Sequence, residues 1–119
     1  MSKKVLGRAF VRYDGKALPT LPGAKLNPGG TERTPVVLES GEVRYTEKLV
    51  NAEIEVEVAI GKDTDILALN KITEATITFE CDTGQRYIMR NGFCTGPINL
   101  SSGDGKGSIK FAGEAVKQA

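Results

Sequence analysis

The sequence of 119 residues contains no histidine and no tryptophan. Histidine is the commonest general base in enzymes and the commonest metal ligand, so its absence removes the usual partner that activates a cysteine or serine nucleophile. Two cysteines, Cys81 and Cys94, cannot form a structural zinc site unaided. We therefore predict no catalytic, metal-binding or cofactor-binding residue, and we do not expect an enzyme.

The sequence also lacks a surplus of charge of either sign and any long apolar run. Its 16 basic and 15 acidic residues leave a net charge of +1, which gives no general attraction to nucleic acid or to an anionic membrane. No apolar run approaches the roughly 20 residues that span a bilayer. The first residues, MSKKVLGRAF, have no apolar segment or cleavage pattern of a secretory signal. We expect folding in a reducing cytoplasm, with both cysteines as free, buried thiols rather than a disulfide.

What the sequence does contain is alternation of apolar and polar residues with a period of two, which is typical of β-strands. The clearest strand is NAEIEVEVAI, residues 51–60, with one apolar face and Glu53, Glu55 and Glu57 on the other. The dipeptide Asp14-Gly15 predicts a type I′ hairpin turn, and the SGE sequence at 40–42 predicts a second hairpin between VVLE and VRYTEKLV. Further strands are predicted in GRAFVRY, EATITFEC, RYIMRN, FCTGPINL (interrupted by Gly96-Pro97) and SIKFAGE.

One segment departs from this alternation and predicts a helix over about residues 64–71. In GKDTDILALNKI, Asp63 is the expected N-cap, Asp65 lies in the first turn, and Ile66 and Leu69 share one face. The predicted fold is therefore mainly β: a single domain, residues 1–119, forming an antiparallel sandwich or barrel with one short helix. We expect flexible ends at about 1–4 and 115–119.

The segment PTLPGAKLNPGGTERTP, residues 19–35, fits no strand or helix pattern and holds four of the five prolines. Irregular segments longer than about 12–15 residues are uncommon in compact domains and are either functional or disordered. The prolines lower the entropy cost of ordering this segment. Leu18, Leu21 and Leu26 are apolar residues that a flexible linker does not need, and this combination favours contact with another protein chain.

Two polar features allow more than one interpretation. Glu53, Glu55 and Glu57 form either an ordinary solvated face or a surface that repels DNA. A sheet normally places a lysine or arginine opposite such a row, and the sequence leaves open whether Arg86, Arg90 or Lys110 lies there. The glycine-rich SSGDGKGS, residues 101–108, lacks the spacing of a phosphate-binding loop and is interpreted as a hairpin connection.

Three segments together carry a family resemblance: GRAFVRYDGKALPTLPGAKLNPGGTERTP, CDTGQRYIMRNGF and GDGKGSIKFAGE. In this order they resemble the tail tube proteins of Mu-like contractile-tailed bacteriophages, from about Gly7 to Glu114. The resemblance implies a structural protein without enzymatic activity, built as a β-sandwich with a flanking helix. It also implies hexameric rings that stack into a hollow tube for DNA delivery, with strands from six subunits joined into one barrel around the channel.

The resemblance gives the candidate residues a role. Contacts between subunits and stacked rings are expected from Leu18, Leu21, Leu26, Pro28, Ser40, Gly41 and Glu42, and a channel-facing acidic row from Glu53, Glu55 and Glu57. The implied partners are identical subunits and the sheath, tape measure, baseplate and tail terminator proteins. DNA is expected to pass without specific binding and no membrane is involved. The implied location is the virion tail, after assembly in the host cytoplasm.

A monomeric β-barrel binding module for a small ligand or oligosaccharide is the alternative function. Such a module needs a pocket with convergent aromatic residues. The three tyrosines, Tyr13, Tyr45 and Tyr87, are widely spread along the sequence.

Overall fold

The structure, a computed structural model, describes residues 3, 6–62 and 65–118. Within them the chain forms eleven strands and one short helix. In chain order the elements are β1 Ala9–Tyr13, β2 Lys16–Ala17, β3 Lys25–Asn27, β4 Gly30–Val37, β5 Val43–Val50, β6 Ala52–Ala59, α1 Ile66–Asn70, β7 Ala75–Cys81, β8 Arg86–Cys94, β9 Asn99–Ser101, β10 Lys106–Gly113 and β11 Lys117–Gln118.

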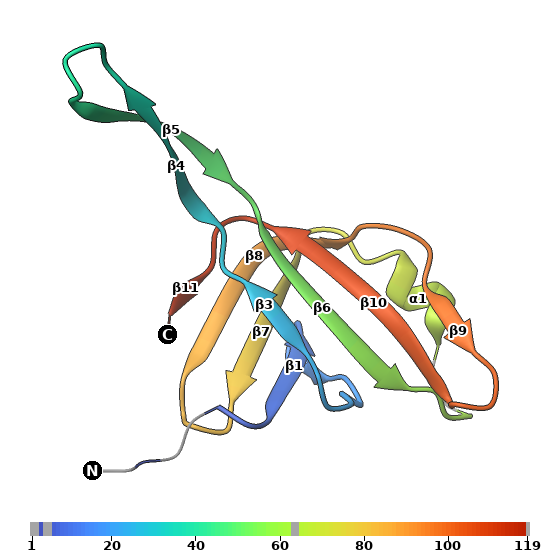
Figure 1. The fold of residues 1–119 in the computed structure, drawn as a ribbon. Coiled ribbons are helices and arrows are strands. Elements are labelled where there is room, and N and C mark those ends of the chain that lie inside the picture. Colours follow the sequence, from blue (N-terminus) through green and yellow to red (C-terminus); the bar gives the residue numbers. More distant parts are fainter. Residues whose placement is uncertain (1–2, 4–5, 63–64, 119) are drawn as a thin grey trace.

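The body of the protein is an antiparallel β-sandwich. Its strands follow the order β2-β1-β7-β8-β10-β6-β3, with β11 beside β8 and β9 beside β10. Figure 1 shows β1, β7 and β8 lying behind β6, β3 and β10, because the sheet turns over where β8 passes to β10. The described strands end at β2 and β3 without closing a ring, so of the two predicted architectures the chain adopts the sandwich.

Alternate residues of the strands fill the space between the two layers. The largest fully buried side chains are those of Phe111, Ile54, Ile77, Met89, Val11 and Val58. In β6 the burial alternates as the sequence predicted, since Ile54, Val56 and Val58 are buried while the glutamates between them are not. The predicted inward positions Ile77 and Phe79 of β7 are buried as well.

The turn at Asp14-Gly15 joins β1 to β2 as predicted. The φ angles are +47° at Asp14 and +82° at Gly15, and a type I′ turn requires positive values at both central residues. The predicted strand interruption at Gly96-Pro97 is confirmed too, because β8 ends at Cys94 and β9 begins at Asn99.

The helix begins later than predicted. Asp65 lies outside α1 as its N-cap, in extended geometry, and its carboxylate accepts a hydrogen bond from the backbone N–H of Ala68 at 3.0 Å. Because this cap satisfies a free donor of the first turn, it fixes the start of the helix at Ile66. The predicted N-cap, Asp63, is outside the described residues. Leu69 faces the core and Ile66 is half-buried, as expected of one apolar face.

Much of the proline-rich segment is regular, which the sequence did not predict. Residues 19–27 run along the edge of β6: the Leu21 N–H donates to the Glu57 carbonyl at 2.7 Å, and the Ala59 N–H donates to the Pro19 carbonyl at 2.9 Å. Leu26 of β3 then pairs with Ile54. The remainder, from Gly30, belongs to β4. Proline is compatible with these strands because each is at an edge, where the missing N–H faces away from the sheet.

The C-terminal end is also ordered by pairing rather than free. The Val116 N–H donates to the Pro28 carbonyl at 2.9 Å, and Lys117 and Gln118 pair with Ile88 and Tyr87 of β8. Within the end that the sequence predicts to be flexible, residues 116–118 thus bond through their backbone to two other segments.

Candidate assembly surfaces

The hairpin of β4 and β5 projects from the sandwich (Figure 1). Its strands pair from Gly30↔Val50 to Val37↔Val43, and residues 31–37 and 43–49 are all exposed. The molecule measures 64 × 40 × 27 Å with a radius of gyration of 17.5 Å. A compact domain of this length has about 13.5 Å. The hairpin thus extends the molecule well beyond a compact shape.

One face of this hairpin is apolar. Directly opposed residues of an antiparallel pair share a face, so the register assigns side chains to each side. We call the apolar hairpin face the set formed by Thr31, Pro35, Val37, Val43, Tyr45 and Leu49. Leu49 is 87% exposed, Val37 72% and Tyr45 61%. Large apolar side chains at this exposure on one surface are typical of an interaction site.

A single ion pair interrupts the apolar hairpin face. The Arg33 Nε lies 3.0 Å from Glu47 Oε1, and the Arg33 guanidinium lies 5.7 Å from the centre of the Tyr45 ring. Arg33 therefore contacts both a carboxylate and an aromatic ring on this face.

The opposite face of the hairpin is polar. The Lys48 Nζ lies 3.8 Å from Glu32 Oε2, Thr34 is opposite Thr46, and Arg44, opposite Val36, forms an ion pair with Glu42 at 3.2 Å. This face is suited to water, so the hairpin is amphipathic.

The predicted contact residues at the hairpin tip are exposed. Ser40, Gly41 and Glu42 form a turn closed by the Leu38 N–H to the Glu42 carbonyl, at 2.8 Å, and by the Gly41 N–H to the Leu38 carbonyl, at 2.9 Å. These backbone bonds fix the tip, which is accessible to a neighbouring molecule.

The other predicted contact residues differ in accessibility. Leu18 is only 7% exposed and lies in the core, because its N–H bonds to the Val11 carbonyl at 3.0 Å and turns the side chain inward. It therefore stabilises its own subunit and presents little surface to a neighbour. Leu21 and Leu26 are half-buried, and Pro28 is exposed.

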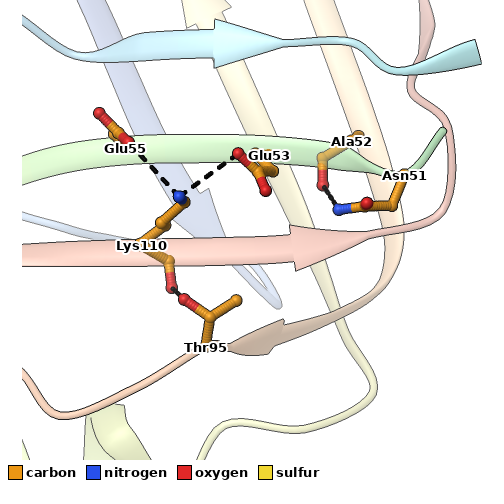
Figure 2. Close-up of polar contacts among 6 residues, drawn as sticks. All are labelled: Asn51, Ala52, Glu53, Glu55, Thr95 and Lys110. Carbon is orange, nitrogen blue, oxygen red and sulfur yellow. Dashed lines mark hydrogen bonds and ion pairs between the residues drawn. The ribbon is translucent and has the colours of Figure 1, made fainter. Parts of the chain in front are cut away.

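A second surface is the outer face of β3, β6 and β10. We call the charged face the set formed by Lys25, Glu53, Glu55, Glu57, Lys106 and Lys110. The three glutamates lie on this face, opposite the buried side of β6, as predicted. Lys110 is directly opposite Glu55, whereas Arg86 is opposite Glu80 on β7. Figure 2 shows the Lys110 ammonium between Glu53 and Glu55.

Both cysteines are free: Cys81 is buried and Cys94 half-buried. Burial, and to a lesser degree the neighbouring Asp82 carboxylate, raises the pKa of the Cys81 thiol, so the thiol stays protonated near neutral pH. Among the described residues no group of three or more acidic or cysteine side chains could hold a metal ion. In the same residues, no helix has the length and apolar character needed to cross a membrane.

A hollow of about 570 Å³ lies beside the charged face. Its lining includes Lys25, Glu55, Thr95 and Lys110, together with the Pro22-Gly23 turn, and none of the three tyrosines. It lacks the convergent aromatic residues that the alternative function, a ligand-binding module, requires.

The structure is thus an antiparallel sandwich from which an amphipathic hairpin projects. The chain belongs to the phage tail tube protein family, whose model matches residues 2–118. It is 36% identical over 118 residues to the Mu-like prophage FluMu tail tube protein of Haemophilus influenzae, which covers 99% of this chain and 98% of that protein. The resemblance seen in the sequence is thereby confirmed, and the chain is a tail tube subunit.

Solved structures share the fold at low sequence identity. The cap that terminates the tube of an anti-feeding prophage superposes with a TM-score of 0.75 at 12% identity, covering 100% of this chain and 93% of the cap chain. A chain of the sheath/tube terminator of an extracellular contractile injection system superposes with a TM-score of 0.74 at 12% identity, and the match covers 100% of this chain and 98% of that chain. A chain of the sheath-tube complex of such a system superposes with a TM-score of 0.68 at 13% identity, and the match covers 94% of this chain and 88% of that chain.

Family membership confirms the expected structural, non-enzymatic role, and the ligand-binding module is set aside.

Sequence reasoning missed the apolar hairpin face. A signal for it exists, because Val43, Tyr45 and Leu49 are spaced by even numbers in VRYTEKLV. Only the register of the hairpin, however, shows that Pro35 and Val37 join them on the same side.

Proposed function

We propose that this tail tube subunit forms hexameric rings, and that the rings stack into the hollow inner tube of a contractile tail, through which DNA is delivered. The observation that carries the proposal is the projecting hairpin with its apolar face exposed.

An isolated two-stranded hairpin is at best marginally stable in water. Covering one large apolar side chain contributes about 1.5–3 kcal/mol, so burial of Val37, Tyr45 and Leu49 on another molecule would stabilise both the hairpin and the assembly. In a ring or stack of identical subunits, each hairpin is covered by the same neighbouring surface. Self-assembly therefore accounts for the apolar hairpin face in every copy.

We assign further subunit contacts to the tip residues Ser40, Gly41 and Glu42, which are the most distant from the sandwich along the hairpin. Leu26 and Pro28 lie where the chain approaches the hairpin, and Leu21 lies beside Glu57 toward the other end of β6. These three residues form a second group of proposed contacts between rings. Their exposed or half-buried surfaces support this assignment.

We further propose that the charged face lines the channel. The charged side chains project from the outer side of β3, β6 and β10, and the inner side of these strands packs against the core. In the proposed tube, strands of adjacent subunits extend this layer into a barrel around the channel. A reconstruction of the assembled tube that locates Glu55 on the outer wall would contradict this placement.

The proposed partners are identical subunits, the surrounding sheath, and the tape measure, baseplate and terminator proteins that complete a tail. The likeness of fold to chains of a sheath-tube complex and of a sheath/tube terminator supports the sheath and terminator. The proposed location is the tail of the virion.

The test compares two pairs of substitutions on the hairpin. Tyr45→Ser with Leu49→Ser removes apolar surface from the apolar hairpin face, whereas Val36→Ser with Thr46→Ser changes the polar face of the same strands. We expect wild type and the polar-face variant to form rings or tubes in negative-stain microscopy at high concentration. The apolar-face variant should remain dispersed with an unchanged far-UV circular dichroism spectrum.

Two results would contradict the proposal. One is normal tube formation by the apolar-face variant. The other is the absence of any ring or tube from wild type at high concentration.

A further inference from the structure

We infer that the charged face is an electrically balanced surface, on which the glutamates pair with Lys106 and Lys110 and so prevent these lysines from holding DNA. The inference rests on the proposed function in one respect: DNA delivery through the tube brings DNA close to this face. It differs from the idea of an acidic, repelling row, because the structure shows as many lysines on this face as glutamates.

The balance follows from the register of three strands. All the charged residues of β3, β6 and β10 are Lys25, Glu53, Glu55, Glu57, Lys106 and Lys110. Lys25 and Lys110 are each directly opposite Glu55, and Lys106 is opposite Ala59. Opposed residues share a face and every second residue of a strand returns to it, so all six charges lie on one side. Their sum is zero.

Distances show that two of the three lysines, Lys106 and Lys110, form ion pairs with the glutamates. The Lys110 Nζ lies 3.4 Å from Glu53 Oε2 and 3.7 Å from Glu55 Oε1 (Figure 2). The Lys106 Nζ donates a hydrogen bond to Glu57 Oε2 at 3.2 Å.

The backbone of Lys110 is also held in place. Its carbonyl accepts hydrogen bonds from the Thr95 N–H at 3.0 Å and the Thr95 hydroxyl at 3.2 Å. The sheet thus positions the Lys110 ammonium between two carboxylates.

These pairs contribute little to folding. The glutamate side chains are 40–54% exposed, and exposed ion pairs are typically worth about 0–1 kcal/mol. Their effect on a polyanion is larger, because each unpaired lysine that meets a phosphate releases condensed counterions. In a hexamer the face would carry about eighteen carboxylates and about as many ammonium groups, so it would neither attract nor repel DNA by its net charge.

The experiment measures binding of a fluorescent double-stranded DNA oligonucleotide to the full chain by anisotropy, at 50 mM and 200 mM salt. Wild type should show no binding. Glu53→Gln, Glu55→Gln and Glu57→Gln together free Lys106 and Lys110 from their ion pairs and should bind. The logarithm of affinity should then fall with the logarithm of salt with a slope of about −1.8, which is roughly a 12-fold loss between the two salt concentrations.

Two controls separate masking of the lysines from other effects of charge. Glu39→Gln, Glu74→Gln and Glu114→Gln change the net charge equally, but these glutamates lie outside the charged face and belong to none of the described ion pairs. We expect this variant to bind at least tenfold more weakly than the charged-face variant. The second control adds Lys25→Gln, Lys106→Gln and Lys110→Gln to the charged-face variant, which restores the wild-type net charge and should abolish binding.

The inference is overturned if the charged-face variant binds no better than the Glu39/Glu74/Glu114 variant, if the six-residue variant still binds, or if wild type itself binds. Should the triple variant unfold, Glu57→Gln frees Lys106 alone and should show binding with a slope of about −0.9. Microscopy of wild-type tubes tests the proposed function separately, since DNA binding by the subunit does not depend on tube formation.

Discussion

Replacing Gly29 with alanine should destabilise the subunit more than an ordinary glycine substitution in a turn. Gly29 lies between β3 and β4, at the root of the projecting hairpin, with φ of +69°. A Cβ atom built there would lie 2.7 Å from the Val50 carbonyl oxygen and the Asn51 carbonyl carbon, and 2.8 Å from the Ala52 nitrogen. These are backbone atoms at the junction of β5 and β6, so no side-chain rotation relieves the contact.

Gly105 provides a matched control, because its φ of +66° is nearly the same and a Cβ atom there would meet nothing within 4 Å. Gly105→Ala should therefore show the cost of the left-handed conformation alone, about 1–2 kcal/mol. Gly29→Ala should add the cost of forcing a methyl group against a packed backbone, about 1–3 kcal/mol. The sum, about 2–5 kcal/mol, is a large part of the 5–15 kcal/mol by which domains are typically stable.

Urea unfolding followed by far-UV circular dichroism measures both variants, since the chain has no tryptophan to report by fluorescence. The midpoint should fall further for Gly29→Ala than for Gly105→Ala, with the slope unchanged. Equal midpoints for the two variants would refute the reasoning, because the close approach to Val50 and Asn51 would then have no energetic consequence.

Three further predictions concern the core, the buried thiol and a proposed contact. Phe111→Ala should lower the free energy of unfolding by about 3–5 kcal/mol in urea unfolding, since Phe111 is fully buried, whereas the exposed Lys110→Ala on the same strand should cost under about 1 kcal/mol. The raised pKa of Cys81 means that the folded state prefers the protonated thiol. The thiol's contribution to stability should therefore be present below the ordinary pKa and be lost as pH rises above about 8.5. Urea unfolding midpoints from pH 7 to 10 should show a decline that Cys81→Ala reduces. Leu26→Ala should reduce tube formation in negative stain while the subunit remains folded by circular dichroism, and normal tubes would exclude Leu26 as an anchor.

The strands of the sandwich could be predicted because burial of one face imposes a period of two on the sequence. Ile54, Val56 and Val58 alternate with glutamates for this reason, and the structure places both sets as expected. The turn at Asp14-Gly15 was predictable from local chemistry, since few residues adopt positive φ there.

The proline-rich segment could not be predicted in the same way because its structure depends on a distant edge. Residues 25–27 become a strand, and Thr20 forms an isolated bridge, only by bonding to β6, and local sequence does not encode which edge is free. Leu18 illustrates the consequence: its neighbours suggest an exposed anchor, yet the chain turns it into the core. The pairing of Lys106 and Lys110 with the acidic row likewise depends on the register between β6 and β10.

The parts of the chain that are complete in one subunit indicate what drives assembly. The edge of β6 is covered by residues 19–27, and the strands at the two ends of the sheet order, β2 and β3, have only two and three residues. Short or covered edges give little scope for uncontrolled pairing between sheets. The apolar hairpin face is uncovered, and the Arg33–Glu47 pair divides it into the cluster of Val37, Val43 and Tyr45 and the separate Leu49. A charged pair within an apolar strand surface opposes indiscriminate aggregation. We therefore attribute assembly to burial of the hairpin on a surface that must also accommodate this ion pair, a requirement that favours one specific neighbour over random association.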